Sequence, residues 1–329
     1  MANWLNLSKE EQLNLFNQLS AKTGLPAFAI EKDAWVSLVL RMLFLSEISK
    51  HLIFKGGTSL SKAYQLIERF SEDIDFAISR EYLEFSDELS KGEIRKLRRA
   101  SHYFSSSVLP LILQRQFSEY GIAENVYTIE VPNIQVSDQD PEIVLVNYRS
   151  VFEELAYLKS SVRVEIGARS LIEPFENRSI QSIVDENYPN ADFKENSFEV
   201  STVIPEKTLF EKMILLHEEF QKQPDEIKSH RMSRHLYDIL QIARTPFGER
   251  AFNRPELFKT ICLHRARFTP TRNINYQNLT IASLNFIPPS AVLNNYRNDY
   301  REMQDTMIYG ESLDFDLLLE ELKNITTKI

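Results

Sequence analysis

Two aspartates separated by one residue are the feature of this 329-residue chain with the clearest chemical potential. Asp73 and Asp75 lie in residues 73–78, where side chains alternate in the manner of a β-strand. Residues at positions i and i+2 of a strand point to the same face, so the two carboxylates can share hard cations. Like charges this close are unfavourable unless a cation compensates them. We therefore predict that Asp73 and Asp75 bind Mg²⁺ or Mn²⁺.

A phosphate-binding element is predicted upstream of these acids. Residues 52–55 are short and apolar and end at a glycine pair, as a buried strand does at a tight turn. Two hydroxyl residues then open a helix expected at residues 58–67, so backbone N–H groups and the helix dipole would face an anion there. The four residues that could cradle phosphates are Gly56, Gly57, Thr58 and Ser59. Phosphates at this turn would reach metals on the aspartates, as in-line transfer of a nucleotidyl group requires.

Two helices are predicted before this unit. Ser8 and Glu11 form a capping box of the S-x-x-E type, which favours a helix to about residue 20. A second helix, with Pro26 as its first residue, is expected to about residue 47, because its apolar residues recur at helical spacing. We expect residues 1–50 to pack on the catalytic unit.

Strand and helix patterns divide the rest of the chain into two parts. A helical stretch is expected at about residues 86–120. Strand-like segments follow at residues 126–136, 143–148 and 161–168. Helices are expected at residues 206–220, 229–243, 255–264, 289–307 and 313–324. We predict an α+β catalytic domain over residues 51–202 and an all-helical domain over residues 203–329.

The glycine pair and the D-x-D pair, with a strand before, a helix between and a strand after, resemble the nucleotidyltransferase fold shared by DNA polymerase β and many small transferases. The resemblance narrows at G-G-T-S-L-S-K-A-Y, at R-F-S-E-D-I-D and at the upstream Glu31-Lys32-Asp33. These segments resemble the AbiEii family of nucleotidyltransferase toxins, which are the toxin half of type IV toxin-antitoxin pairs and relatives of the mycobacterial MenT enzymes. The likeness extends from about residue 31 to residue 240, and it implies a polymerase β-like domain with a mixed sheet.

The resemblance also implies a third metal-binding carboxylate on a neighbouring strand. Glu165, in the segment V-R-V-E-I-G-A-R, is the best placed candidate, with glutamate in place of the commoner aspartate. A strand acid of this kind can instead form an ion pair, here with Arg163 or Arg169.

Four further residues are assigned to the site by the same resemblance. Lys62 and Arg69 would neutralise the triphosphate. Lys212 would contact a nucleotide phosphate, and Asp238 would position it or act as a base. Helical spacing alone equally allows Lys212 and Asp238 to be an ordinary interhelical ion pair. If they belong to the site, the helical domain contributes to the nucleotide pocket.

The implied activity is transfer of a nucleotide from an NTP to an acceptor, the 3′ end of tRNA in the MenT-like members, with a cognate antitoxin encoded separately. Two alternatives remain open: transfer of AMP to a protein hydroxyl, and an NTP-binding module without turnover. Residues 228–272 contain ten Lys or Arg residues and three acids, which favours an RNA acceptor although solvated helix faces could have the same composition. A second basic group could also contact RNA, namely Lys91, Arg95, Lys96, Arg98 and Arg99.

Composition excludes several other classes. The net charge of −9 disfavours indiscriminate binding to polyanions. The single cysteine, Cys262, can form neither an internal disulfide nor a multi-thiol zinc site. No apolar run approaches the length of a membrane span, and the first residues lack the pattern of a secretory signal, so we expect a cytoplasmic protein.

Overall fold

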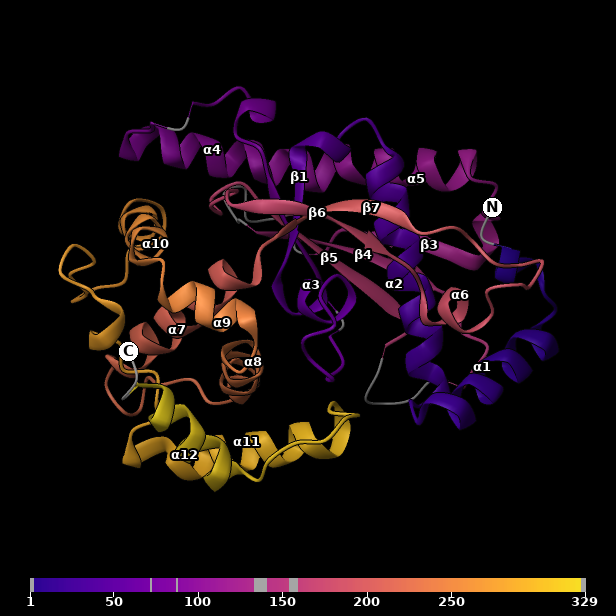
Figure 1. Ribbon diagram of the computed structural model, residues 1–329. Coiled ribbons are helices and arrows are strands. Elements are labelled where there is room, and N and C mark those ends of the chain that lie inside the picture. The colour runs from indigo at the N-terminus through magenta and orange to yellow at the C-terminus, as the bar shows by residue number, and fades with distance from the viewer. Residues whose placement is uncertain (1–2, 72, 87, 133–140, 154–158, 327–329) are drawn as a thin grey trace. The chain divides into compact units, whose positions relative to one another are not determined.

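The computed structural model describes residues 3–71, 73–86, 88–132, 141–153 and 159–326, which form two compact units (Figure 1). Met1–Ala63 and Glu72–Thr202 form one, here called the sheet unit. Tyr64–Ser71 and Val203–Ile329 form the other, here called the helical unit. The chain therefore leaves the sheet unit after the glycine turn, adds eight residues to the helical unit, and returns for the D-x-D strand.

A seven-stranded sheet in the order β3-β4-β5-β2-β1-β7-β6 is the framework of the sheet unit. Its strands are β1 (Leu52–Lys55), β2 (Asp73–Ile78), β3 (Tyr127–Glu130), β4 (Glu142–Tyr148), β5 (Ser161–Gly167), β6 (Phe175–Ile180) and β7 (Phe198–Val203). β2 is antiparallel to β1 and parallel to β5, and β1 is parallel to β7, so the sheet is mixed. This confirms the predicted α+β class.

The core of the sheet unit lies on one face of this sheet. Alternate residues of the central strands, such as Ile74, Phe76 and Val164, are almost completely buried. Helix α2 (Ala27–Leu45) packs against them, with the Trp35 ring stacked on Tyr148 at 4.9 Å between centroids. Burying an aliphatic or aromatic side chain contributes about 1.5–3 kcal/mol, which makes this face the main source of the unit's stability.

The N-terminal helices agree with the sequence prediction in position. α1 (Lys9–Thr23) begins after Ser8, whose hydroxyl accepts from the backbone N–H of Glu11 in a complete capping box. It ends at Gly24, which has a positive φ of 76°. α2 follows Pro26, which caps the helix rather than beginning it.

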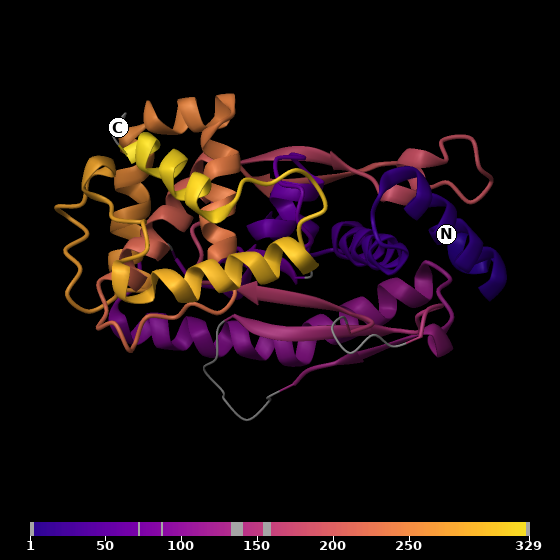
Figure 2. The same ribbon diagram turned by 90° about the horizontal axis from the view of Figure 1, so that it is seen from below.

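The helical stretch expected at residues 86–120 begins later than predicted and contains an irregular turn. Ser90 caps α4 (Lys91–Tyr103), which continues through a π-helical turn (Phe104–Val108) into α5 (Leu109–Glu119). This run lies beside β3 and β4 (Figure 2). π-helical turns of this kind insert one residue into a helix and change which side chains face the sheet.

Helix α3 (Gly56–Lys62) is five residues shorter at its C-terminal end than the predicted 58–67, and it begins two residues earlier. The prediction was wrong here because residues 64–71 belong to the other unit. Gln65 has a positive φ of 53°, which no continuing helix allows. The strand expected at 126–136 is observed as β3, and residues 133–136 lie outside the described residues.

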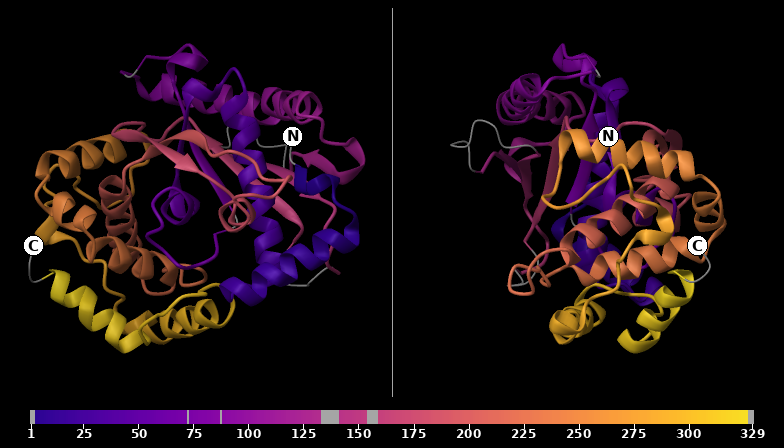
Figure 3. Two further views of the ribbon diagram at one scale, coloured as in Figure 1. Left: turned by 45° about the vertical axis from the view of Figure 1, so that its right-hand side comes forward. Right: turned by 90° about the vertical axis from the view of Figure 1, so that its left-hand side faces the viewer.

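The helical unit is coloured largely in orange and yellow in Figure 3, and two of its helices contact most of the others. Its helices are α7 (Pro205–Phe220), α8 (Ser233–Ala243), α9 (Pro246–Phe252), α10 (Pro255–Phe268), α11 (Leu293–Thr306) and α12 (Phe315–Thr326). α7 contacts α8, α9 and α10, and α8 also contacts α11 and α12. Four elements were not predicted from the sequence: α9, the strands β6 and β7, and the short helix α6 (Ile183–Asn187) of the sheet unit.

Replacement of Leu43, a fully buried residue of α2, by alanine should lower the free energy of unfolding of the sheet unit by about 2–5 kcal/mol, because it leaves a cavity. The matched control is Leu111→Ala on α5, where the leucine is 70% exposed and the expected change is about 0.5 kcal/mol or less. Urea denaturation of both variants measures the difference. Equal losses for the two leucines would contradict the packing described here.

Candidate active site

The predicted acidic residues lie on one face of two neighbouring strands, β2 and β5. Asp75 is opposite Lys55 of β1 and Glu165 of β5, and Asp73 is opposite Arg163 of β5. Paired residues of adjacent strands share a face, so these five side chains form a half-buried polar surface on the side of the sheet away from Ile74 and Phe76. The strand register thus brings together the D-x-D pair and the third predicted carboxylate.

The glycine turn lies against this acidic surface. Gly56 has a positive φ of 83°, and a methyl group on its Cα would overlap the Asp75 carboxylate. Only glycine satisfies both conditions without strain. The turn that ends β1 therefore approaches Asp75 more closely than any other residue type would allow.

The two hydroxyl residues after the glycines are buried and bonded to backbone. The Thr58 hydroxyl donates to the backbone carbonyl of Asp73, and the Ser59 hydroxyl donates to the carbonyl of Gly56 at 2.9 Å. The Thr58 bond ties the start of α3 to the start of β2. A phosphate at this turn would consequently meet the backbone N–H groups of the glycines before it met either hydroxyl.

Arg163 is the counter-ion of the acidic surface. Its guanidinium lies 2.6 Å from Glu165 and 3.8 Å from Asp73. Burial, with the nearby Asp75 carboxylate, raises the pKa of Glu165, and Arg163 opposes that rise. The ion pair that the sequence left open for Glu165 is therefore present.

The carboxylate oxygens of this surface are of the type that Mg²⁺ and Mn²⁺ prefer. The pKa of Glu165 is raised first by burial and then by the neighbouring Asp75 and Asp73 carboxylates, and a cation would relieve this second effect. Among the described residues, no three acidic, histidine or cysteine side chains are grouped closely enough to hold a metal ion. The three carboxylates are thus suitable donors in chemistry, but Arg163 holds Glu165 and they are not grouped as metal ligands in this structure.

Lys62, predicted to face the triphosphate, is paired inside the sheet unit. Its ammonium donates to the Asp33 carboxylate, with both side chains about nine-tenths buried. The other Asp33 oxygen accepts from the backbone N–H of Ile183 at 2.8 Å. Glu31 similarly accepts from the hydroxyl of Ser150 and from a neighbouring backbone N–H. The acids of the Glu31-Lys32-Asp33 segment thus join α2 to three other parts of the unit.

The three remaining predicted residues lie together in the helical unit. Arg69 donates to both oxygens of Asp238 at 2.7 Å, and Lys212 lies 2.9 Å from the same carboxylate. The Asp238 side chain has no exposed surface. Lys212 and Asp238 do form an interhelical ion pair, and Arg69 is part of it. Their predicted roles toward a nucleotide stay predictions.

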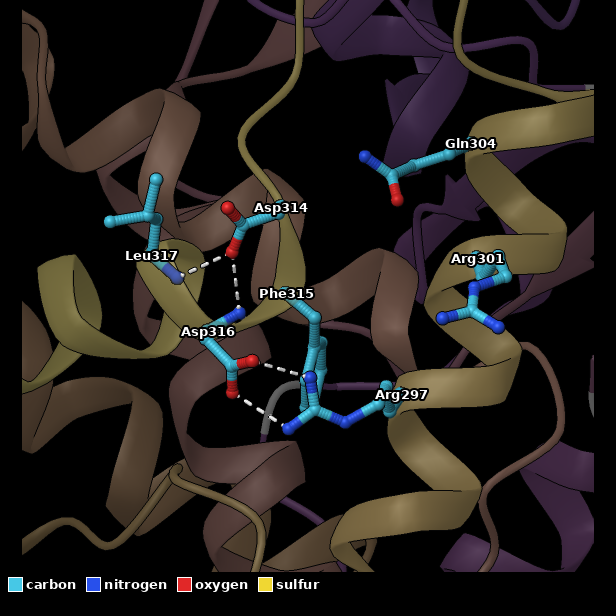
Figure 4. Close-up of a pocket in the computed structure, with 7 residues that line it drawn as sticks. All are labelled: Arg297, Arg301, Gln304, Asp314, Phe315, Asp316 and Leu317. Atoms are coloured by element: carbon cyan, nitrogen blue, oxygen red, sulfur yellow. Dashed lines mark hydrogen bonds and ion pairs between the residues drawn. The ribbon is translucent and has the colours of Figure 1, made fainter.

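A separate hollow between α11 and α12 in the helical unit is shown in Figure 4. Arg297 pairs with both oxygens of Asp316 at 2.6 and 2.7 Å, and Asp314 accepts from the first backbone N–H groups of α12. The polar groups that line this hollow therefore hold the start of α12 in place.

Sequence reasoning missed three members of these clusters. Lys55 and Asp33 were not considered as partners, and Arg163 was considered only as an alternative. The signal for Lys55 was its place at the end of the predicted strand 52–55, directly before the glycine pair. Asp33 had no such signal, because its contact with Lys62 spans 29 residues.

Comparison with families of known proteins gives a match over most of the chain. Residues 38–321 match the family described as "Nucleotidyl transferase AbiEii toxin, Type IV TA system". The chain belongs to this family. It is accordingly a nucleotidyltransferase toxin of a type IV toxin-antitoxin system, for which an NTP is the substrate and a separate antitoxin is the partner.

Two solved structures match over most of the chain. One is MenT4, a nucleotidyltransferase toxin from Mycobacterium tuberculosis H37Rv, with 14% identity, a TM-score of 0.47, and coverage of 98% of this chain and 99% of that one. The other is JHP933 from Helicobacter pylori, with 13% identity, a TM-score of 0.38, and coverage of 85% and 97%. No curated protein sequence matches. Among the described residues, no helix combines the length and apolar character needed to cross a membrane.

Replacement of Gly56 by alanine should reduce nucleotidyl transfer by about a hundredfold, because the methyl group displaces the Asp75 carboxylate. It should also lower stability by about 1–2 kcal/mol, since alanine is strained at this positive φ. The control is Gly92→Ala near the start of α4, where a methyl group meets nothing within 4 Å and activity should be unchanged. A fully active Gly56→Ala enzyme would show that the turn does not constrain the site.

Proposed function

We propose that this toxin transfers a nucleotidyl group from an NTP to the 3′ end of tRNA, using the acidic surface of β2 and β5. The observation that carries the proposal is the register of the sheet, which places Asp73, Asp75 and Glu165 on one face beside the close-packed Gly56. The choice of tRNA rests on the resemblance to MenT-like toxins and on the distribution of basic residues described below.

Asp73 and Asp75 would hold Mg²⁺ or Mn²⁺, and Glu165 would join them where Arg163 releases it. A bound ion of this kind neutralises triphosphate charge and orients the phosphate that is attacked. Arg163 itself would balance the acids before nucleotide and metal arrive, so that the surface does not carry three unpaired charges.

The backbone N–H groups of Gly56 and Gly57 would bind the phosphates, since the adjacent hydroxyls are bonded elsewhere. Lys62 would add positive charge at the end of α3 through its paired ammonium, and Thr58 would keep the turn aligned with Asp73. Lys212 would contact a nucleotide phosphate, and Asp238 would position it or act as a base, as the family resemblance implies.

The basic residues best placed for an RNA acceptor are on α4. Four of them are exposed, namely Lys91, Arg95, Lys96 and Arg99. Tyr103, four residues beyond Arg99, is 64% exposed and could stack on a base. By contrast, several cations of residues 228–272 are neutralised by acids: Arg244 by Glu321, Arg250 by Glu206, Arg254 by Glu256 and Arg265 by Glu218. Part of the positive charge of residues 228–272 is thus already neutralised, which favours the exposed cations of α4 as contacts for RNA phosphates.

Changing Asp73 and Asp75 together to asparagine should abolish divalent-dependent NTP binding and reduce transfer by about a hundredfold or more, because the charge is removed while the volume is kept. The control changes two exposed aspartates of the helical unit, Asp225 and Asp305, in the same way. Incubation with each labelled NTP and bulk tRNA measures transfer. Undiminished labelling by the Asp73/Asp75 variant would refute the site, and label on protein instead of tRNA would favour the AMP-transfer alternative.

Changing Lys91 and Lys96 to glutamate should weaken tRNA binding by about tenfold. It should also reduce the slope of log K against log salt concentration by about one for each lysine, with NTP binding unaffected. The same double change at Lys22 and Lys50, two exposed lysines elsewhere in the sheet unit, is the control. Filter binding across a range of salt concentrations measures both quantities. Equal behaviour of the two variants would remove α4 as the RNA surface.

A further inference from the structure

The strand β6 (Phe175–Ile180) forms one edge of the seven-stranded sheet and is open to solvent. It lies beside β7, and in the described part of the chain no further strand pairs with its outer N–H and C=O groups (Figure 1). Five of its six residues are exposed or half-buried, and only Ile180 is buried. The opposite edge strand, β3, has four residues, and its Tyr127 is buried and stacked on Phe117. β6 is therefore the more open edge of the sheet unit.

An unpaired strand edge is a template for another strand, and proteins usually protect such edges with proline, lysine, bulges or a covering element. The sequence of β6, F-E-N-R-S-I, contains neither proline nor lysine. The Phe175 ring is 41% exposed. The edge thus keeps its backbone donors and acceptors and presents an aromatic ring next to them, which favours pairing with a partner strand.

The two charges of β6 match a second copy of the same strand. Glu176 and Arg178 share one face, because they are two residues apart in a strand. In an antiparallel pair centred on residue 177, each Glu176 is directly opposite Arg178 of the other copy, and residue 177 is opposite itself. Side chains directly opposite have Cβ atoms about 4.5–5.5 Å apart, where opposite charges attract. In this register the strand is complementary to itself.

Arg178 is oriented for such a contact by a bond inside the sheet unit. Its Nε donates to the carbonyl of Ala63 at 3.0 Å. Its Nη1 lies 3.8 Å from Glu176 of the same strand, too far for a hydrogen bond, and the two side chains are 41% and 46% exposed. On the other face, Phe175 would lie opposite Ser179, whose small side chain leaves room for the ring. Neither face therefore opposes the pairing.

We propose that β6 pairs with β6 of a second copy of this chain, antiparallel and centred on Asn177, so that the two sheets continue into one another across a two-fold axis. Each copy supplies the same strand, as in the isologous interfaces of symmetric dimers. The pairing satisfies the outer backbone groups and forms two Glu176–Arg178 ion pairs. Because the edge has only six residues, the dimer is weak and exchanges with the monomer. The inference does not depend on the proposed nucleotidyl transfer.

The first test reverses the charges. Sedimentation velocity of the full-length chain from about 1 to 200 µM should show monomer and dimer in a concentration-dependent equilibrium. Glu176→Arg and Arg178→Glu should each raise the dimer dissociation constant by about tenfold or more, since each places like charges opposite one another twice. Combining the two changes should restore association, because the ion pairs form again with their signs exchanged. The control is Glu256→Arg, which breaks a comparable i, i+2 pair with Arg254 in the helical unit.

The second test is a cross-link at the two-fold axis. Asn177→Cys should give a covalent dimer under mild oxidation, since facing Cα atoms of an antiparallel pair are about 4.5–5.5 Å apart, within disulfide range. The only natural cysteine, Cys262, is buried. Glu176→Cys should not cross-link, because its two copies are displaced along the strands by about 7 Å. Thr128→Cys on β3 is the control for the other edge.

A chain that stays monomeric at about 200 µM and gives no cross-link at position 177 would overturn the proposal. Cross-linking of Thr128→Cys or Glu176→Cys in place of Asn177→Cys would equally overturn it, by placing the contact at the other edge or in another register. A combined charge exchange that associates as weakly as the single variants would show that Glu176 and Arg178 do not face each other. Circular dichroism checks the fold of each variant, and the cross-link decides the question where a charge variant does not fold.

Discussion

The position of β2 between β1 and β5 is the constraint on which the candidate site depends. β2 carries Asp73 and Asp75 on one face and Ile74 and Phe76 on the other. A shift of one residue in its register would bury both carboxylates in the core. The buried face therefore fixes the position of the acids, although it takes no part in chemistry.

The same register explains why Gly56 must be glycine. Lys55, the last residue of β1, is opposite Asp75, so the chain has to turn away directly beside that carboxylate. The positive φ and the absence of a Cβ allow this turn. Thr58 then bonds to the backbone of Asp73, which ties the beginning of α3 to the beginning of β2. The glycine turn and the strand that carries the two aspartates are thus held together by the backbone.

Three cations considered for the site are paired with acids of the protein itself. Arg163 pairs with Glu165, Lys62 with Asp33, and Arg69 with Asp238. Buried charges require such partners, because an unpaired ion in a low-dielectric interior is costly. A basic residue close to a nucleotide motif is therefore not by itself a phosphate ligand.

The sequence by itself determined the local elements around the site: the strand before the glycines, the D-x-D strand, β5 with Glu165, and the helices α1, α2 and α7. Each has a signal within a few residues, such as the Ser8 capping box or alternation over residues 73–78. The partners of the charged residues were decided by tertiary structure. The contacts of Lys62 with Asp33 and of Arg69 with Asp238 span 29 and 169 residues. The end of α3 at Lys62 likewise depended on the crossing of residues 64–71 into the helical unit. Periodicity reports which face of an element is buried, whereas the identity of a distant partner depends on packing that no local pattern contains.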